Sequence, residues 1–106
     1  MKKQLWSSGN GWVLHIPKPL LKLLGYNPKE VRLLITAKPK TLTIEPISTE
    51  DIEKYANNMV RKMQRSSGGY GIYFPLPFIE ILEITPETDF LNIDIDGNIL
   101  TISKAG

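Results

Sequence analysis

The chain contains one pattern of residues twice, and the second copy follows the first at an offset of 58 residues. Aligned without gaps, residues 4–44 match residues 62–102 at eleven of 41 positions. The prolines show the pattern most clearly: Pro17, Pro19 and Pro28 recur as Pro75, Pro77 and Pro86. A chain of 106 residues has room for only two such copies, and their period is longer than that of common solenoid repeats. The repeat therefore predicts two paired units rather than an open array.

Each copy has the signals of two hairpins around a short helix. We predict first strands at residues 4–6 and 61–65, a turn at the Ser/Gly clusters SSGNG and SSGG, and second strands at residues 12–16 and 70–74. Prolines suited to a first helical turn then precede the apolar runs LLKLL and FIEIL, and Gly25 is a candidate C-terminal cap. Closing hairpins follow at residues 31–45 and 90–103. The order in each unit is β-β-α-β-β.

The two closing hairpins have different turn residues. Asp96 and Gly97 form a strong two-residue hairpin signal, because glycine readily adopts positive φ. The first unit has Lys38 and Pro39 at the matching place, and the ring of proline excludes positive φ. We therefore expect the two copies to turn differently.

A single unit is too small to support a core of its own. It is close to the length below which disulfides or a metal are usually required, and the chain has no cysteine and one histidine. We therefore predict that residues 1–46 and residues 61–106 interlock into one mainly β barrel with short helices and pseudo-two-fold symmetry. Residues 47–60 would join them through a helix of roughly 10 residues, about 15 Å long, with Ser48 or Thr49 as N-cap; an extended or partly disordered linker is the alternative.

Charge divides the two halves. Residues 1–46 have eight lysines and arginines against two glutamates, a net charge of +6, whereas residues 47–106 have five against nine, a net charge of −4. The basic half could face a polyanion, the two halves could attract each other, or the difference could be ordinary surface variation. No run of 18 apolar residues and no signal peptide is present, so we expect a cytoplasmic protein without a membrane segment.

The motifs resemble a known family. A short basic strand, a Gly/Ser/Asn turn, a strand ending in His15-Ile16-Pro17, the helix LLKLLG, a proline and a closing hairpin look like the AbrB/MazE (SpoVT-AbrB) swapped-hairpin superfamily. The second copy, RKMQRSSGGYGIYFP, is similar to its archaeal-type members. The resemblance implies a swapped-hairpin, double-psi-like barrel, normally made by two chains and here made by two tandem repeats.

The resemblance also implies a function. The family binds double-stranded DNA, as transcriptional regulators or as the DNA-binding half of antitoxins, through the first strand, the following loop and the residue before the "IP" strand end. The corresponding residues in this chain are Lys2, Lys3, Gln4, Trp6, Ser7, Ser8, Asn10, His15, Arg61, Lys62, Gln64, Arg65, Ser66 and Ser67.

The chain departs from the family pattern at one position of each unit. The family often has arginine directly before "IP", whereas this chain has His15 and Tyr73, so a strong phosphate or guanine contact is missing there. His15 could contact a phosphate when protonated, or it could be packed or hydrogen-bonded within the fold. Trp6 and Trp12 could stack on bases, but packing is the commoner role of tryptophan in a short strand.

Other functions find less support in the sequence. One histidine and no recognisable pair of carboxylates give no enzymatic constellation, and no cofactor is implied. The acidic residues Glu87, Asp89, Asp94 and Asp96 could hold a cation, but alternate residues of a hairpin are usually solvated, so we expect no metal. The rival to DNA binding is a protein-interaction or assembly module. An antitoxin-like role with a toxin partner is not favoured, because no extended tail follows the second unit. A homodimer remains open.

Overall fold

The computed structural model describes residues 1–9, 11–66 and 69–105, and within them the protein is mainly β with short helices. The first unit contains β1 (Lys2–Lys3), β2 (Trp6–Ser8), β3 (Gly11–Ile16), α1 (Lys18–Leu24), β4 (Arg32–Lys38) and β5 (Thr41–Ile47). The second contains β6 (Val60–Lys62), β7 (Gln64–Ser66), β8 (Gly69–Phe74), α2 (Leu76–Leu82), β9 (Leu91–Asp96) and β10 (Ile99–Lys104). Strands β3 and β8, and helices α1 and α2, are related by the offset of 58 predicted from the repeat.

The strands form two sheets in which the units are interleaved. One sheet has six strands in the order β1-β9-β10-β5-β4-β6, and the other has four in the order β2-β3-β8-β7. The first strand of each unit pairs with the other unit, β1 along β9 and β6 along β4, while β3 pairs with β8. Strands that correspond under the offset of 58, such as β1 and β6 or β3 and β8, occupy equivalent positions from the two ends of each sheet. The two units thus contribute equivalent strands to both sheets.

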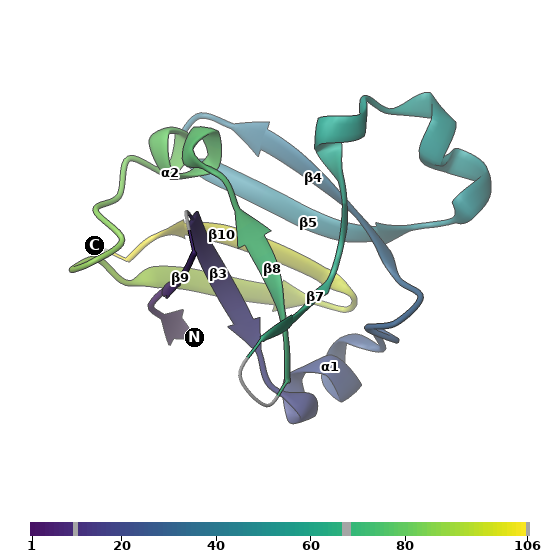
Figure 1. The fold of residues 1–106 in the computed structure, drawn as a ribbon, viewed down its shortest axis with the longest axis horizontal. Helices are drawn as coiled ribbons and strands as arrows, with labels where there is room; N and C mark the ends of the chain where they lie inside the picture. Colours follow the sequence, from purple (N-terminus) through teal and green to yellow (C-terminus); the bar gives the residue numbers. More distant parts are fainter. Residues whose placement is uncertain (10, 67–68, 106) are drawn as a thin grey trace.

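The predicted barrel is not closed by strand pairing. We predicted one continuous first strand in each unit, at residues 4–6 and 61–65. Residues 61–65 are instead shared between β6 and β7, which belong to different sheets. In the first unit only Trp6 of the predicted strand is in a strand, β2, and β1 precedes it in the other sheet. The break falls at Leu5 and at Met63, which are related by the repeat and are both buried. Because these apolar side chains turn into the core, the backbone leaves one sheet there and enters the other. The result is two open sheets, seen in Figure 1 as β3 and β8 crossing over β5 and β10.

One hydrophobic core lies between the two sheets. Leu14 of β3 and Ile72 of β8 are fully buried on one side, and Leu42 of β5 and Leu100 of β10 on the other. Both units therefore supply residues to the same cluster. Burial of apolar side chains is the main favourable term in folding, at about 25 cal/mol per Å². Stability of either unit thus depends on the other.

The helices begin and end as the sequence indicates, with one exception. Pro17 and Pro75 are the N-cap residues, and a second proline follows in the first turn of each helix. Gly25 closes α1 in the left-handed conformation at φ 75°, as predicted. Its counterpart Glu83 adopts the same conformation at φ 55° although it has a β-carbon. That backbone conformation costs a non-glycine residue about 1 kcal/mol. At seven residues each, α1 and α2 are far too short to cross a bilayer, and none of the described helices could do so.

The two closing hairpins turn differently, as Pro39 predicts. In β4–β5 the positive φ falls on Lys40, the second turn residue, at 62°. In β9–β10 it falls on Gly97, the first turn residue, at 61°. Proline occupies the first turn position in the first hairpin and cannot adopt positive φ. The strained conformation therefore moves to the next residue.

The linker consists of two short 3-10 helices, η1 (Thr49–Lys54) and η2 (Asn57–Met59), instead of the single helical tether that we predicted. Ser48 precedes η1, as expected, but its hydroxyl donates to the Asp51 carboxylate (3.0 Å) rather than accepting a backbone N–H bond. No residue of η1 is buried. A longer helix would have no apolar face to pack, and short isolated helices are marginal in water. The linker forms a separate lobe at one end of the molecule (Figure 1).

Candidate nucleic-acid interface

The outer face of the four-stranded sheet combines side chains from both units. Residues paired across neighbouring strands point to the same face. Trp6 pairs with Val13 and Val13 with Tyr73, so these three share a face; His15 pairs with Gly71, and Gly71 with Gln64. The alternate residues of β3 and β8 point into the core. We call this outer face, with the basic residues of β1 and β6 beside it, the candidate interface.

Two aromatic rings lie across glycines of the opposite unit. A β-carbon at Gly11 would lie 2.4 Å from Cε1 of Tyr73, and one at Gly69 would lie 3.0 Å from Cε1 of His15. The two contacts are equivalent under the repeat, because Gly11 corresponds to Gly69 and His15 to Tyr73. The residue before each "IP" or "FP" strand end therefore packs on the first residue of β3 or β8 in the other unit. A β-carbon at Gly11 would force the Tyr73 ring to shift, and one at Gly69 would be in tight contact with the His15 ring.

His15 is held between Trp6 and the second unit. The rings of Trp6 and His15 stack with centroids 4.3 Å apart and planes inclined by 7°. Burial, and secondly the positive charge of Lys3, lower the pKa of His15 below its usual value. This shift favours the neutral imidazole and so disfavours the predicted phosphate contact by a protonated histidine. Trp6 is 43% exposed, and stacking on His15 occupies one face of its indole ring.

The arginines of the second unit lie against aromatic rings. The guanidinium carbon of Arg61 is 5.9 Å from the ring centroid of Tyr73 and 5.8 Å from that of Phe78, and its buried Nε has no hydrogen-bond partner among the described residues. Arg65 lies 5.8 Å from the centroid of Tyr70. Such contacts hold the cation in place without neutralising it. The charge of exposed Arg65 thus remains open to an anion, whereas that of half-buried Arg61 is less accessible.

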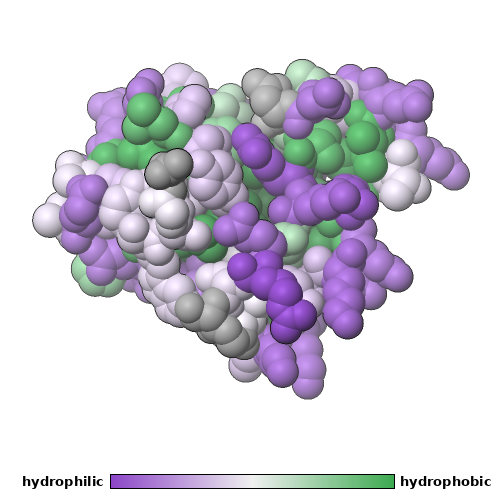
Figure 2. Space-filling view, viewed as in Figure 1, coloured by the Kyte–Doolittle hydropathy of each residue, from purple (hydrophilic) through white to green (hydrophobic). Residues whose placement is uncertain are grey.

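The lysines lie at the two edges of the six-stranded sheet. Lys2 and Lys3 are on β1 at one edge, and Lys62 is on β6 at the other. Lys2 and Lys62 are exposed, and Lys3 is half-buried near His15. Figure 2 shows a hydrophilic band on the side of the four-stranded sheet where β7 lies, beside a nearly neutral surface over β3. Basic residues of both units therefore lie on the two edge strands of the six-stranded sheet.

The remaining predicted site residues divide into four groups. Ser7 and Ser8 of β2 are exposed, and Gln64 and Ser66 of β7 are half-exposed. Gln4 is engaged within the fold, because its Nε2 donates to the carbonyl oxygens of Glu87 (2.8 Å) and Pro86 (3.4 Å). It therefore ties the first unit to the second. Asn10 and Ser67 lie outside the described residues.

From the sequence, Tyr70 was predicted in a strand, Phe78 in an apolar helix run and the two glycines in turns, and none of these residues was predicted to belong to the site. The offset of 58 offered a signal for part of this arrangement, because it equates Tyr73 with His15 and Gly69 with Gly11. The pairing of β3 with β8 was also needed, since it brings each ring to the opposite unit. The pairing of these two strands cannot be read from the sequence pattern of either unit alone.

The acidic residues do not form a metal-binding group in the described part of the chain, where no three His, Cys, Asp or Glu side chains lie close enough together. Asp89 instead accepts a hydrogen bond from the backbone N–H of Thr85 (2.7 Å) and lies 3.7 Å from Nζ of Lys104. Its position is thus explained by the turn that follows α2. Asp94 and Asp96 are exposed on β9.

Comparison of the chain with models of protein families, with curated proteins and with solved structures found no match.

Proposed function

We propose that the protein is a DNA-binding transcriptional regulator that contacts double-stranded DNA with the candidate interface. The single observation that carries the proposal is that basic residues of both units lie on edge strands of the two sheets: Lys2 and Lys3 on β1, Lys62 on β6 and Arg65 on β7. Lysines and arginines that meet phosphates release counterions, which is the main source of sequence-independent affinity for DNA. Exposed Ser7 and Ser8 would add hydrogen bonds to the backbone that fix the register.

The symmetry of the fold supports the same function. The order β2-β3-β8-β7 is symmetric about the junction of β3 and β8, so equivalent strands of the two units stand on either side of it. Double-stranded DNA also has local two-fold symmetry between its strands, and paired DNA-binding units commonly use this correspondence. We propose that one chain provides the two DNA-binding units that the AbrB/MazE family usually builds from two chains. Exchange of β1 and β6 between the units is consistent with the swapped-hairpin arrangement of that family.

A salt titration tests this proposal. Fluorescence anisotropy of a labelled duplex of about 30 base pairs would give the dissociation constant between roughly 50 and 200 mM salt. Replacing Lys2 and Lys3 together with alanine should weaken binding and lower the slope of log K against log salt by roughly 0.9 for each lost phosphate contact. A control variant replaces Lys29 and Lys38, which are both exposed and lie outside the candidate interface. Equal effects of the two double variants would contradict the assignment of the interface.

An assembly module is the second candidate function. The observations that favour it are the net charge of −4 on residues 47–106, the lowered pKa of His15 and the Arg61 guanidinium that lies against two rings. Each of these reduces the attraction of the candidate interface for phosphate. The expected result in this case is no DNA binding at micromolar protein at any salt concentration, together with a mass in solution above that of one 12.0 kDa chain. A monomer that binds DNA would exclude this alternative.

A further inference from the structure

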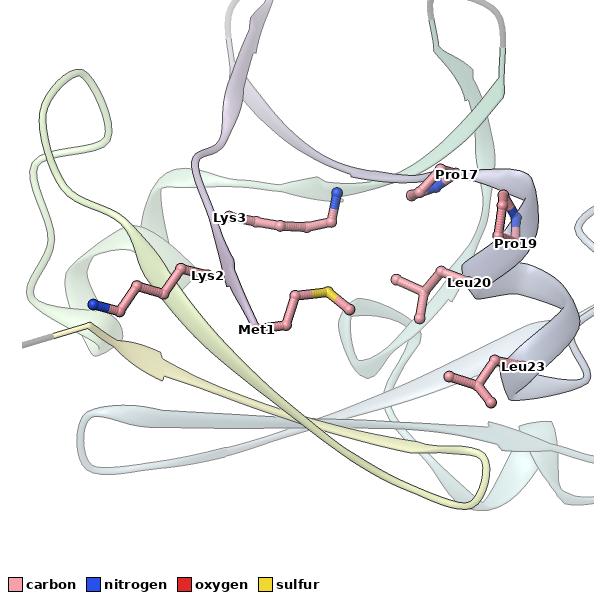
Figure 3. A pocket seen from close by; sticks show the side chains of 7 residues that line it. All are labelled: Met1, Lys2, Lys3, Pro17, Pro19, Leu20 and Leu23. Carbon is pink, nitrogen blue, oxygen red and sulfur yellow. The ribbon is translucent and has the colours of Figure 1, made fainter.

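A pocket of about 480 Å³ lies between β1 and the beginning of α1, and we call it the β1–α1 pocket. Its apolar lining comes from Met1, Pro17, Pro19, Leu20 and Leu23, and Lys2 and Lys3 complete it. Figure 3 shows Met1, Leu20 and Leu23 pointing into a common space, with the Lys3 side chain reaching along the mouth toward Pro17 and Lys2 pointing away. A mostly apolar cavity of this volume with one or two polar groups is typical of a small-molecule site.

The second unit offers an internal comparison. Under the offset of 58, Leu20 corresponds to Phe78 and Lys3 to Arg61. There, the Arg61 guanidinium carbon lies 5.8 Å from the centroid of the Phe78 ring, which also packs edge-on against Phe74 with centroids 5.8 Å apart. The second unit therefore has an aromatic ring beside a cation where the first unit has a shorter leucine and a lysine. The β1–α1 pocket has room for a ring that the chain itself does not supply.

We propose that the β1–α1 pocket binds an aromatic monocarboxylate, with its ring against Leu20 and Leu23 and its carboxylate paired with Lys3. Leu23 is 67% exposed, so a bound ring would remove apolar surface from water. The Lys3 ammonium supplies the complementary charge at the mouth, and its half-buried position strengthens the ion pair relative to one in bulk water. Lys2, on the same strand, adds positive potential nearby.

Titration of the full chain with 2-naphthoate by isothermal calorimetry tests the site. We expect saturable binding of one molecule, and weaker binding of 2-naphthol, which has the same ring system without the carboxylate. Leu20→Phe introduces the side chain found in the second unit and should lower the affinity about tenfold or more by filling the pocket. Lys3→Gln should lower it about tenfold, as expected for loss of a charged partner. Lys38→Gln removes an exposed charge elsewhere and should leave it unchanged.

Three results would overturn the proposal. They are no binding of 2-naphthoate at low millimolar concentration, equal binding of 2-naphthol, and unchanged affinity in a folded Leu20→Phe variant. If circular dichroism shows that Leu20→Phe does not fold, Leu23→Glu replaces it, because the exposed Leu23 side chain is not needed by the core. Its added carboxylate should repel the ligand, and unchanged affinity would again overturn the proposal. The test contains no DNA, so its outcome is independent of that of the DNA-binding proposal.

Discussion

Tyr26 links the two units through a hydrogen bond whose loss can be measured. Its side chain is 6% exposed, and its hydroxyl donates to the backbone carbonyl of Asn98 in the β9–β10 turn at 2.6 Å. Tyr26→Phe removes the donor and leaves the ring in place. An uncharged hydrogen bond contributes a net of about 1 kcal/mol to stability. We expect the variant to lose about 1 kcal/mol of unfolding free energy at pH 7.

The same residue makes a pH-dependent contribution. Burial, and secondly the negative charge of Glu45, raise the pKa of Tyr26 from 10.0 to about 12. Above pH 10 the unfolded chain releases this proton while the folded protein retains it, so unfolding becomes more favourable as pH rises from 10 toward 12. At pH 11 a shift of this size lowers the unfolding free energy by about 1 kcal/mol. Tyr26→Phe has no ionisable group at this position, so its unfolding free energy does not decrease for this reason. The difference in unfolding free energy between wild type and variant should therefore fall toward zero at pH 11.

Urea denaturation of both proteins at pH 7, 9 and 11 measures this difference, with unfolding free energies from linear extrapolation. Other tyrosines and the lysines titrate in the same range, so the informative quantity is the difference between wild type and variant at each pH. Tyr55→Phe is the matched control, because Tyr55 is 38% exposed on the linker. A Tyr26→Phe difference that stays constant from pH 7 to pH 11 would refute the reasoning, as would an effect no larger than that of the control.

Three further results are expected. Gly71→Ala should destabilise the fold by about 1 to 3 kcal/mol in chemical denaturation, because its β-carbon would lie 2.3 Å from Cγ1 of Val13. The double variant with Val13→Ala should lose less unfolding free energy than the sum of the two single variants, and simple additivity would argue against the clash. Glu83→Gly should raise the unfolding free energy by about 0.5 to 1 kcal/mol by relieving the left-handed conformation, and a lower melting temperature would contradict this. The isolated segment 1–46 should not fold as a monomer, because β1 and β5 pair with strands of the second unit; native-like circular dichroism at monomeric mass would count against the shared core.

The repeat in the sequence was sufficient to predict the units and most of their elements. The prolines and the apolar runs act locally, so Pro17 and Gly25 bound α1 as predicted. The incompatibility of Pro39 with positive φ likewise foretold that the two hairpins would differ. Glu83 shows the limit of such reasoning, since its backbone follows that of Gly25 in the other unit although its side chain disfavours the conformation. There, the packing of the repeated fold outweighs the local preference.

Pairing between distant strands had to come from the tertiary structure. The sequence offered no means to see that Leu5 and Met63 interrupt the first strands, because an apolar residue inside a strand is compatible with one sheet or two. It is also the pairing of β3 with β8 that sets His15 over Gly69 and Tyr73 over Gly11 and thereby shapes the candidate interface. Residue type and spacing determine local conformation, whereas the register between strands far apart in the chain depends on how both units fill one core. The amino-acid pattern therefore determined that there are two units and where the helices and hairpin turns of each unit lie. The shared core decided which strands pair and which aromatic rings and basic residues come close to one another.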